Sequence, residues 1–197
     1  MQLTKIKGMK FPDEFIVRSF FKERLFERQG NVIEYGCGNG SNLSVYYQYG
    51  WNIAGIDVSE KSLEEANANF AILSKECDDI GSYQFLCVDM LGFPVIKKYD
   101  AILFPGSLYY MSKANCLSML ARLPELIGEN GAFCYFRMRR PNDYRVGISK
   151  LLADGYTREI VDDLTSEKGC HMTFWEEDDF IAEIRKHCNL SNYSNLI

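Results

Sequence analysis

The chain has 197 residues and a net charge of −5, with 47% hydrophobic and 25% charged residues. These values predict a single globular domain without a membrane span and argue against nucleic acid as a partner. The seven cysteines include no C-x-x-C pair, which argues against a disulfide framework and a metal site and predicts a reducing, cytoplasmic location.

Segments with the periodicity of helices and strands alternate through the first two thirds of the chain. A helix is expected at 15–28, where Val17, Phe20, Phe21 and Leu25 share one helical face. Apolar runs predict strands at 31–35, 52–56, 83–88, 100–104 and 131–138, and helices are expected at 41–49, 59–75 and 113–127. This alternation predicts a doubly wound α/β fold with a mainly parallel sheet.

The ends of two helices and the last third of the chain carry weaker signals. Ser62 and Glu65 resemble a capping box near the start of the 59–75 helix, and Pro124 is expected to bend or shorten the 113–127 helix. After Met138 the alternation stops. We expect strands of a hairpin or flap at 155–162 and 171–175, a helix at 176–187 and a last strand at 189–197.

The stretch VIEYGCGNGSN, residues 32–42, contains three glycines directly behind an apolar run. Glycine costs about 0.5–1 kcal/mol relative to alanine in regular structure, so this cluster predicts an unusual backbone that a ligand approaches closely. The glycines stand at i, i+2 and i+4, whereas the dinucleotide fingerprint needs i+5, and no Gly-Lys-Ser/Thr of a phosphate loop follows. Glu34, just before the glycines, favours a positively charged ligand over a phosphate.

Two further acids end the next two predicted strands. Asp57 follows Gly36 by 21 positions, a spacing that suits a carboxylate bound to the hydroxyls of a ribose. Asp89 closes the third strand in FLCVDM, where the base of a nucleoside would lie. A structural role in a helix start or a loop is the alternative for each.

The segments VIEYGCGNGSN, GIDVSEKSLEEA, FLCVDM and YDAILFPGSLYYM, in this order, resemble the motifs of class I S-adenosylmethionine-dependent methyltransferases. The resemblance covers about 31–138 and implies a Rossmann-like methyltransferase fold with S-adenosylmethionine as cofactor. It implies that Glu34 orders the loop and contacts the amino group of the ligand, that Asp57 binds the ribose, and that Phe104 lies near the sulfonium. The cofactor-binding residues implied are Glu34, Tyr35, Gly36, Cys37, Gly38, Gly40, Asp57, Val58, Asp89, Met90 and Phe104.

The methyl acceptor is expected to be a small molecule, anionic or sugar-like, methylated on oxygen or nitrogen. The Asp/Asn-Pro-Pro-aromatic and Pro-Cys motifs of DNA methyltransferases are absent. The stretch YFRMRRPNDYR concentrates arginines where guanidinium groups would bind an anion; the alternative is that they pair with the acids of 159–183. We expect Arg139 and His171 to be catalytic, and the substrate-binding residues to be Arg137, Arg140, Tyr109 and Tyr110.

A weaker resemblance links this stretch and TSEKGCHMTFWEEDDF to methyltransferases among bacterial surface-polysaccharide enzymes. The expected organisation is one methyltransferase domain over 1–197, with an N-terminal helical cap at 1–30 and a substrate-side flap at 139–175. An incomplete sheet edge makes a homodimer possible. The alternative functions are a non-catalytic protein that binds S-adenosylmethionine or S-adenosylhomocysteine, and a nicotinamide-dependent oxidoreductase, which Asp57 would also serve.

Overall fold

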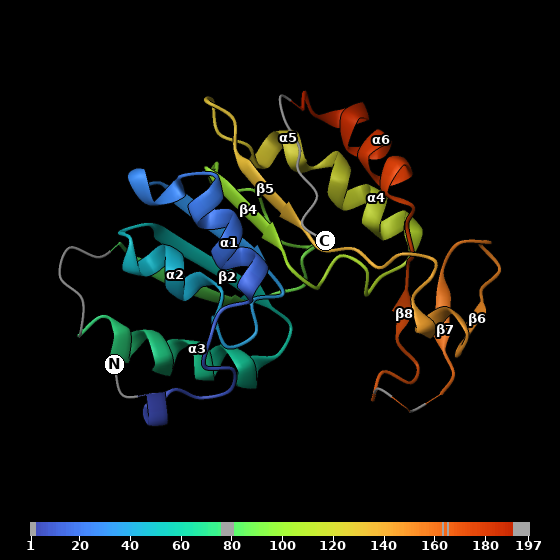
Figure 1. Ribbon diagram of the computed structural model, residues 1–197, viewed down its shortest axis with the longest axis horizontal. Coiled ribbons are helices and arrows are strands. Elements are labelled where there is room, and N and C mark those ends of the chain that lie inside the picture. Colours follow the sequence, from blue (N-terminus) through green and yellow to red (C-terminus); the bar gives the residue numbers. More distant parts are fainter. Residues whose placement is uncertain (1–2, 76–80, 163, 165, 191–197) are drawn as a thin grey trace. The chain divides into compact units, whose positions relative to one another are not determined.

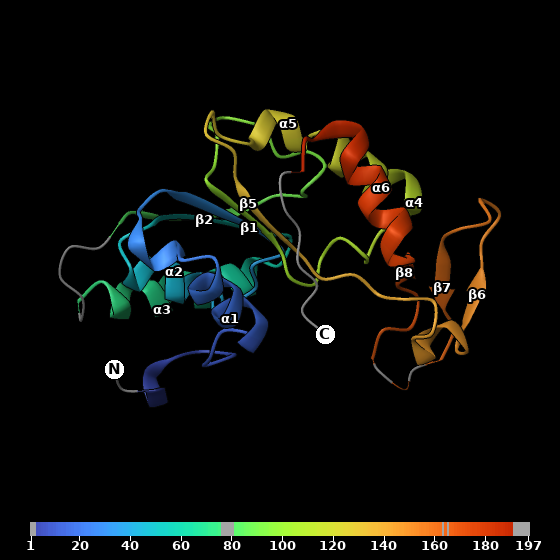
Figure 2. The same ribbon diagram turned by 45° about the horizontal axis from the view of Figure 1, so that its top comes forward.

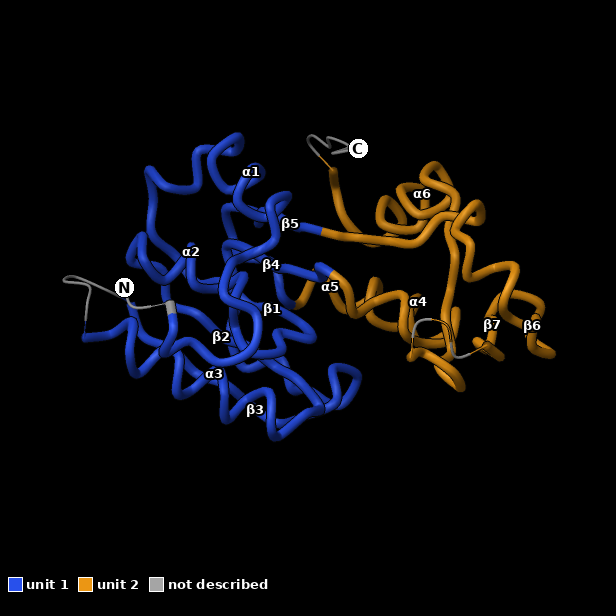
Figure 3. The backbone as a smooth tube through the Cα atoms, turned by 60° about the horizontal axis from the view of Figure 1, so that its bottom comes forward, with its two compact units in different colours: residues 1–105, 126–135, 196 blue, residues 106–125, 136–195, 197 orange. Residues whose placement is uncertain are grey.

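The computed structural model describes residues 3–75, 81–162, 164 and 166–190 (Figure 1). The chain divides into two compact units (Figure 3). The first contains Met1–Pro105 and Leu126–Tyr135, and the second contains Gly106–Glu125 and Phe136–Asn195. Each unit is described separately.

A five-stranded sheet forms the centre of the first unit, in the order β3-β2-β1-β4-β5. Its strands are β1 (Asn31–Tyr35), β2 (Asn52–Asp57), β3 (Tyr83–Cys87), β4 (Ala101–Phe104) and β5 (Phe133–Phe136). β1 pairs in parallel with β2 and β4, and β2 pairs in parallel with β3. The chain therefore builds the sheet outward from β1 in one direction and then, from β4, in the other. The predicted mainly parallel, doubly wound sheet is confirmed, and β1 and β4 flank the point where the strand order reverses, which is where such sheets bind ligands.

Three helices cover one face of this sheet: α1 (Glu14–Lys22), α2 (Leu43–Gln48) and α3 (Glu60–Leu73) (Figure 2). The core between them contains apolar side chains of all three helices and of the facing strand positions, among them Phe20, Tyr46, Phe70, Val32 and Leu103. The edge-to-face contact of Phe20 with Tyr46, at 4.8 Å between ring centroids, ties α1 to α2. Burial of large aromatic side chains dominates the stabilisation of this unit.

Two local predictions about these helices are wrong. The helix expected at 15–28 ends at Lys22, because Arg24 takes a left-handed conformation with φ of 54° and a 3₁₀ turn, η2 (Leu25–Glu27), follows. Phe21 consequently remains exposed. Helix α3 is capped by Ser59, whose hydroxyl accepts the N–H of Ser62 at 3.3 Å, so the capping box does not form where expected. A 3₁₀ turn, η1 (Leu3–Lys5), precedes α1.

The second unit contains α4 (Lys113–Ala121), most of α5 (Leu123–Leu126), α6 (Glu177–His187) and a small antiparallel sheet. The break between α4 and α5, just before Pro124, confirms the expected shortening of that helix. The sheet has the order β6 (Ser149–Leu151), β7 (Arg158–Ile160), β8 (His171–Met172). β7 and β8 fall within the segments expected to be strands, β6 was not expected, and the 3₁₀ turn η3 (Tyr144–Val146) precedes it.

The strand expected at 189–197 falls largely outside the described residues, which end at Leu190. Within the described ranges, no helix combines the length and the apolar composition needed to cross a membrane.

We predict that Gly55→Ala destabilises the first unit. A Cβ at Gly55 would lie 2.7 Å from Sγ of Cys37 and 2.7 Å from Cδ1 of Phe85, so the sheet would have to shift. Overpacking of this kind costs about 1–3 kcal/mol, which urea denaturation would measure. Gly92→Ala is the matched control, since its Cβ would meet only the carbonyl oxygen of Asp89, at 3.7 Å. Equal denaturation midpoints for the two variants would contradict the prediction.

Candidate functional site

The glycine loop, residues 36–40, follows β1 and folds back onto the end of β2. The N–H groups of Gly36 and Cys37 both donate to the carbonyl oxygen of Ile56, at 2.8 and 3.0 Å. Gly36, Gly38 and Gly40 all have positive φ, of 74°, 54° and 76°, which only glycine adopts without strain. A Cβ at Gly40 would lie 2.9 Å from Phe70, whereas at Gly38 nothing lies within 4 Å. The backbone at Gly38 is therefore open to an approaching ligand.

Asp57 holds this loop from the end of β2. One carboxylate oxygen accepts the N–H of Gly38 at 2.8 Å, and the other accepts the N–H of Ser59 at 2.9 Å. A carboxylate has about four lone-pair positions, so these two bonds fix its orientation and leave acceptor capacity for further hydroxyl groups. Val58, the next residue, is 70% exposed and offers apolar surface beside that carboxylate.

Glu34 lies in β1 just before the loop and is only 1% exposed. Its Oε1 accepts a hydrogen bond from Nδ2 of Asn42 at 2.7 Å. Its Oε2 is buried and accepts no hydrogen bond from any residue that the structure describes. Burial raises the pKa of this carboxyl to about 8; the Asn42 hydrogen bond acts against the shift, and the charges of Asp57 and Asp13 add to it. A cation reaching Oε2 would relieve this desolvation.

Three other predicted cofactor residues, Tyr35, Cys37 and Phe104, are buried. The rings of Tyr35 and Phe104 stack with centroids 4.7 Å apart and an interplanar angle of 12°. These residues support the loop and the sheet from inside. The role of Phe104 near a sulfonium stays a prediction.

Asp89 and Met90 follow β3, at the same end of the sheet as Asp57. The Asp89 side chain is exposed and accepts the N–H of Leu91 at 2.8 Å. One carboxylate oxygen thus stabilises a turn, as in the structural alternative for this residue. Met90 is half-buried, and the predicted contact of both residues with a base stays a prediction.

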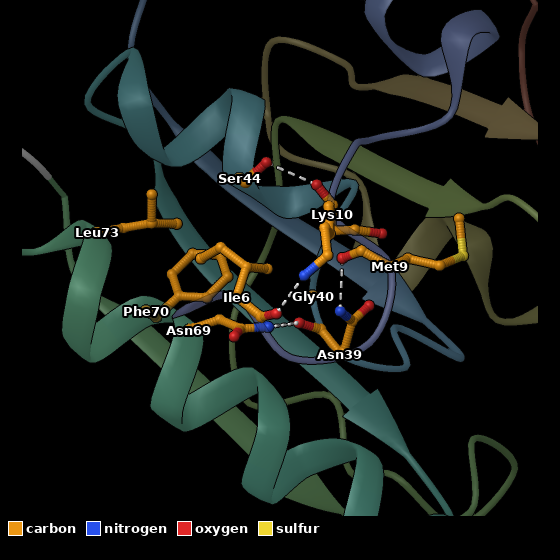
Figure 4. A pocket seen from close by; sticks show the side chains of 10 residues that line it. Ile6, Met9, Lys10, Asn39, Gly40, Ser44, Asn69, Phe70 and Leu73 are labelled. Atoms are coloured by element: carbon orange, nitrogen blue, oxygen red, sulfur yellow. Dashed lines mark hydrogen bonds between the residues drawn. The ribbon is translucent and has the colours of Figure 1, made fainter. Parts of the chain in front are cut away.

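A small, open pocket lies between the N-terminal segment, the glycine loop and α3 (Figure 4). Ile6, Phe70 and Leu73 form its apolar part, and Lys10 and Asn69 contribute polar groups. Asp57 and Val58 are not among the residues that line it. Of the predicted cofactor residues, Gly40 lines the pocket, so the pocket lies against one end of the glycine loop.

The predicted acceptor residues lie in the second unit. Arg139 forms an ion pair with Asp143 at 3.3 Å, and its guanidinium lies 4.9 Å from the ring centroid of Tyr109. Arg140 pairs with Glu177. The alternative that acids of 159–183 neutralise the arginines is thus confirmed for Arg140. Arg137 is half-buried.

A buried ion-pair network surrounds Arg145, which is 11% exposed. Its Nε donates to Glu167 at 2.6 Å and its Nη1 to Asp143 at 3.3 Å. Tyr110 donates its hydroxyl to the same Glu167, and burial together with this bond raises the pKa of Tyr110. The positive charge of Arg145 is thus neutralised by the carboxylates of Glu167 and Asp143.

His171 lies exposed in β8, and its register partner in β7 is Glu159. Among the residues that the structure describes, none makes a hydrogen bond that orients the His171 ring, and its role as a base stays a prediction. Within the described part of the chain, no group of three or more His, Cys, Asp or Glu side chains is placed to hold a metal ion.

Sequence reasoning missed Asn42, which holds Glu34. Asparagine before a helix is ordinarily assigned to helix capping, and Asn42 does occupy the N-cap position of α2, but its side chain makes no capping hydrogen bond. The amide is used for Glu34 and for the backbone of Asp13 instead. The sequence signal that could have found it is an amide directly behind a glycine motif that contains a buried acid.

Comparison with known proteins gives one family and several similar folds. A family model described as a methyltransferase domain matches residues 32–131. A S-adenosylmethionine-dependent methyltransferase from Clostridium acetobutylicum ATCC 824 is 16% identical over 87% of this chain and 77% of that chain, with a TM-score of 0.59. Magnesium protoporphyrin IX methyltransferase from Synechocystis PCC 6803, with bound S-adenosylhomocysteine, is 19% identical over 89% and 69%, with a TM-score of 0.59.

A glycopeptide N-methyltransferase in complex with S-adenosyl-L-homocysteine is 16% identical over 92% of this chain and 82% of that chain, with a TM-score of 0.62. At these identities the similarity concerns the fold. No curated protein matched the sequence.

We predict that Glu34→Gln changes the pH dependence of stability. With a folded pKa of about 8 against an ordinary 4.5, folded Glu34 keeps a proton that the unfolded chain has lost. Stability therefore falls as pH rises through this window, by about 1.4 kcal/mol per pH unit for one proton. Glu34→Gln removes this loss, so the variant gains stability relative to the wild type as pH rises.

Urea denaturation at pH 5, 6.5 and 8 would measure this effect. Glu64→Gln, at an exposed position of α3, is the control and should follow the wild type. If the free energy of unfolding changes with pH in the same way for Glu34→Gln and for the wild type, the prediction is wrong and Glu34 is ionised in the folded protein.

Proposed function

The chain belongs to the family of methyltransferase domains, and from this membership we propose that it transfers a methyl group from S-adenosylmethionine to a small acceptor. One observation carries the choice of cofactor. Open backbone at Gly38, an anchored carboxylate at Asp57 and a buried carboxylate oxygen of Glu34 in need of a donor meet at the reversal point of the sheet. These groups suit a ligand that has a sugar hydroxyl pair and a positively charged amino group.

In this proposal each group has a separate task. The Asp57 carboxylate accepts hydrogen bonds from the ribose hydroxyls, using the lone pairs that are not already bonded to the N–H groups of Gly38 and Ser59. Glu34 accepts the ammonium of the methionine part through Oε2. Ionisation of Glu34 then becomes favourable, because a cation within hydrogen-bond distance offsets its burial. Val58 contacts the adenine.

S-adenosylmethionine, when bound, would supply a methyl carbon on a sulfonium that an acceptor oxygen or nitrogen could attack in line, with S-adenosylhomocysteine as the leaving group. The protein has to hold the acceptor in line with that carbon and exclude water; alignment of this kind contributes about 7–11 kcal/mol in favourable cases. A base is needed only if the acceptor loses its proton during the transfer. His171 is assigned that role for a hydroxyl acceptor, and Arg139 is assigned the orientation of the acceptor.

For the acceptor, we propose a small molecule with hydroxyl or amine groups, such as a sugar. The Arg139 guanidinium lies over the ring of Tyr109, which is buried, so this pair offers an acceptor hydrogen-bond donors and not an aromatic face. Nε of Arg139 is buried and donates to no residue that the structure describes, so a donor remains for the acceptor. An anionic acceptor would compete with Asp143 for the same guanidinium.

Two rival functions make different predictions. A nicotinamide-dependent oxidoreductase disagrees with the family and with the glycine spacing. A protein that binds the cofactor without catalysis agrees with both, and the ion pairs that hold Arg140 and Arg145 favour it over an enzyme with an anionic acceptor. Release of the methyl group into a panel of sugar and amine acceptors separates the enzyme from the binding protein. A homodimer remains a prediction.

We predict that S-adenosylhomocysteine, but not NAD, raises the melting temperature, because only a ligand of the native state stabilises it.

Asp57→Ala should weaken binding of S-adenosylhomocysteine at least about tenfold, as expected for the loss of charge-assisted hydrogen bonds. Isothermal titration would measure the affinity of the wild type and of Asp57→Ala for S-adenosylhomocysteine, with Glu64→Ala, at an exposed position, as the control. Stabilisation by NAD alone would overturn the proposed cofactor, and an unchanged affinity in folded Asp57→Ala would remove Asp57 from the site.

We also predict that Arg139→Ala lowers turnover and leaves the affinity for S-adenosylhomocysteine unchanged, because Arg139 belongs to the acceptor side. Methyl transfer to the best acceptor of the panel measures the first effect, and titration measures the second. Arg18→Ala, at an exposed position of α1, is the control. If Arg139→Ala loses the cofactor as well, the separation of the two sites is wrong.

A further inference from the structure

Three asparagine side chains bind the N-terminal segment, residues 7–13, to the glycine loop and to α3. We call Asn39, Asn42 and Asn69 the asparagine clamp. Nδ2 of Asn39 donates to the carbonyl oxygen of Lys7 at 2.6 Å and to that of Met9 at 2.7 Å, the second of which Figure 4 shows. Asn39 is one of the loop residues between the glycines, so the N-terminal segment is bonded to the loop itself.

Asn69 completes the inner half of the clamp from α3. Its Oδ1 accepts the N–H of Lys7 at 2.8 Å, and its Nδ2 donates to the carbonyl oxygen of Lys7 at 3.1 Å. Nδ2 also donates to the carbonyl oxygen of Asn39 at 3.3 Å (Figure 4). Asn39 and Asn69 are both buried. Buried amides with this many bonds are costly to leave unpaired, so the segment and the loop are held together as one structure.

Gly8 allows the segment to pass this closely over Asn39. Its φ is 63°, and a Cβ there would lie 2.9 Å from Nδ2 of Asn39 and 2.8 Å from Oε2 of Glu65. A side chain at position 8 would therefore be strained and would push the segment away from the clamp. Position 8 offers a way to release the segment without changing any residue of the loop.

Asn42 forms the outer half of the clamp and reaches the buried acid. Its Oδ1 accepts the N–H of Asp13 at 2.9 Å, while its Nδ2 donates to Oε1 of Glu34 at 2.7 Å. Asp13 is the N-cap of α1 and accepts the N–H of Phe15. One amide thus connects the start of α1 to the carboxyl of Glu34 and leaves Oε2 as the oxygen without a donor among the described residues.

We propose that the asparagine clamp makes the N-terminal segment a working part of the cofactor site, with Asn42 as the positioning residue that orients Glu34. This inference rests on the proposed function, because it takes Glu34 as the partner of the ligand's amino group. The segment fixes Asn42 through Asp13, Asn42 fixes Oε1 of Glu34, and Asn39 fixes the loop. Binding of the cofactor and docking of the segment are then coupled, and each favours the other.

The ionisation of Glu34 provides a readout that a purely structural role would not move. The charged and titratable groups around Glu34 are Asp57 from β2, Asp13 from the start of α1, Cys37 in the loop and Tyr46 in α2. The acids disfavour its ionisation, and the hydrogen bond from Asn42 favours it. Loss of that bond raises the pKa of Glu34, so a cationic ligand would need a higher pH to bind with full affinity.

The experiment is titration of S-adenosylhomocysteine between pH 6 and 9 into the wild type, Asn42→Ala, Gly8→Ala and the control Asn67→Ala. Asn67 is an exposed asparagine of α3 that bonds only its own helix, at the carbonyl oxygen of Leu63. We expect Asn42→Ala to bind about tenfold more weakly or worse, with the midpoint of its pH profile moved upward. Gly8→Ala should also bind more weakly, although its Cβ would meet Asn39 and Glu65 and not the open backbone at Gly38. Asn67→Ala should match the wild type.

Each outcome decides between the two proposals. If the wild type does not bind S-adenosylhomocysteine, the proposed function fails, and this inference with it. If the wild type binds and Asn42→Ala binds equally with the same pH midpoint, the positioning role is overturned and the proposed function stands. Weaker binding with an unchanged midpoint also overturns it, since that result describes a structural defect. If Asn42→Ala does not fold, Gly8→Ala decides: an affinity equal to that of the wild type overturns the coupling.

Discussion

The hydrogen bond between Asn42 and Glu34 is the interaction on which the site depends, because it holds a carboxyl group in the sheet where water does not reach it. A carboxyl buried in this way keeps its proton near neutral pH unless a cation approaches its second oxygen. Asp57 adds a second carboxylate, which bonds the loop at Gly38 and is therefore fixed by the same backbone that a ligand would contact. The shape of the loop is thus set by a few connected bonds, and in the proposed function the same bonds position the groups that bind the ribose and the ammonium of the ligand.

The sheet could be predicted because its strands are short apolar runs, and burial of both strand faces demands such runs. The same reasoning could not find the end of α1. Val17, Phe20, Phe21 and Leu25 have helical spacing, but the left-handed residue at Arg24 brings Leu25 into the core from a separate turn. Periodicity records which residues are apolar and carries no information about a single backbone angle. Similarly, Ser59 and Ser62 are equally good capping residues in the sequence, and only the position of the first helical turn distinguishes them.

At the site, a residue could be predicted from the sequence where its position along the chain decides its role, and could not where its role depends on a partner distant in the sequence. The glycines and Asp57 follow from spacing, since the ends of neighbouring parallel strands meet at one edge. Asn42, Asn39 and Asn69 could not be found in this way, because their partners at Lys7, Met9 and Asp13 belong to a segment with no recognisable pattern. The arginines are an intermediate case. Their charge is visible in the sequence, but the pairing of Arg139 with Asp143 and of Arg145 with both Asp143 and Glu167 depends on the path of the chain.

Each unit buries polar atoms that find no partner among the residues that the structure describes, and the kind of group differs between the units. In the second unit, Arg145 is buried with two carboxylates around it, so its charge is compensated within the protein. In the first unit, one oxygen of the buried Glu34 carboxyl has no donor among the residues that the structure describes, and the neighbouring glycine loop leaves its backbone open at Gly38. Local rules that a folded chain breaks without compensation tend to mark function. In the proposed function, the ammonium group of the ligand supplies the missing donor to Glu34, so the group that is unfavourable in the free protein is one that selects the ligand.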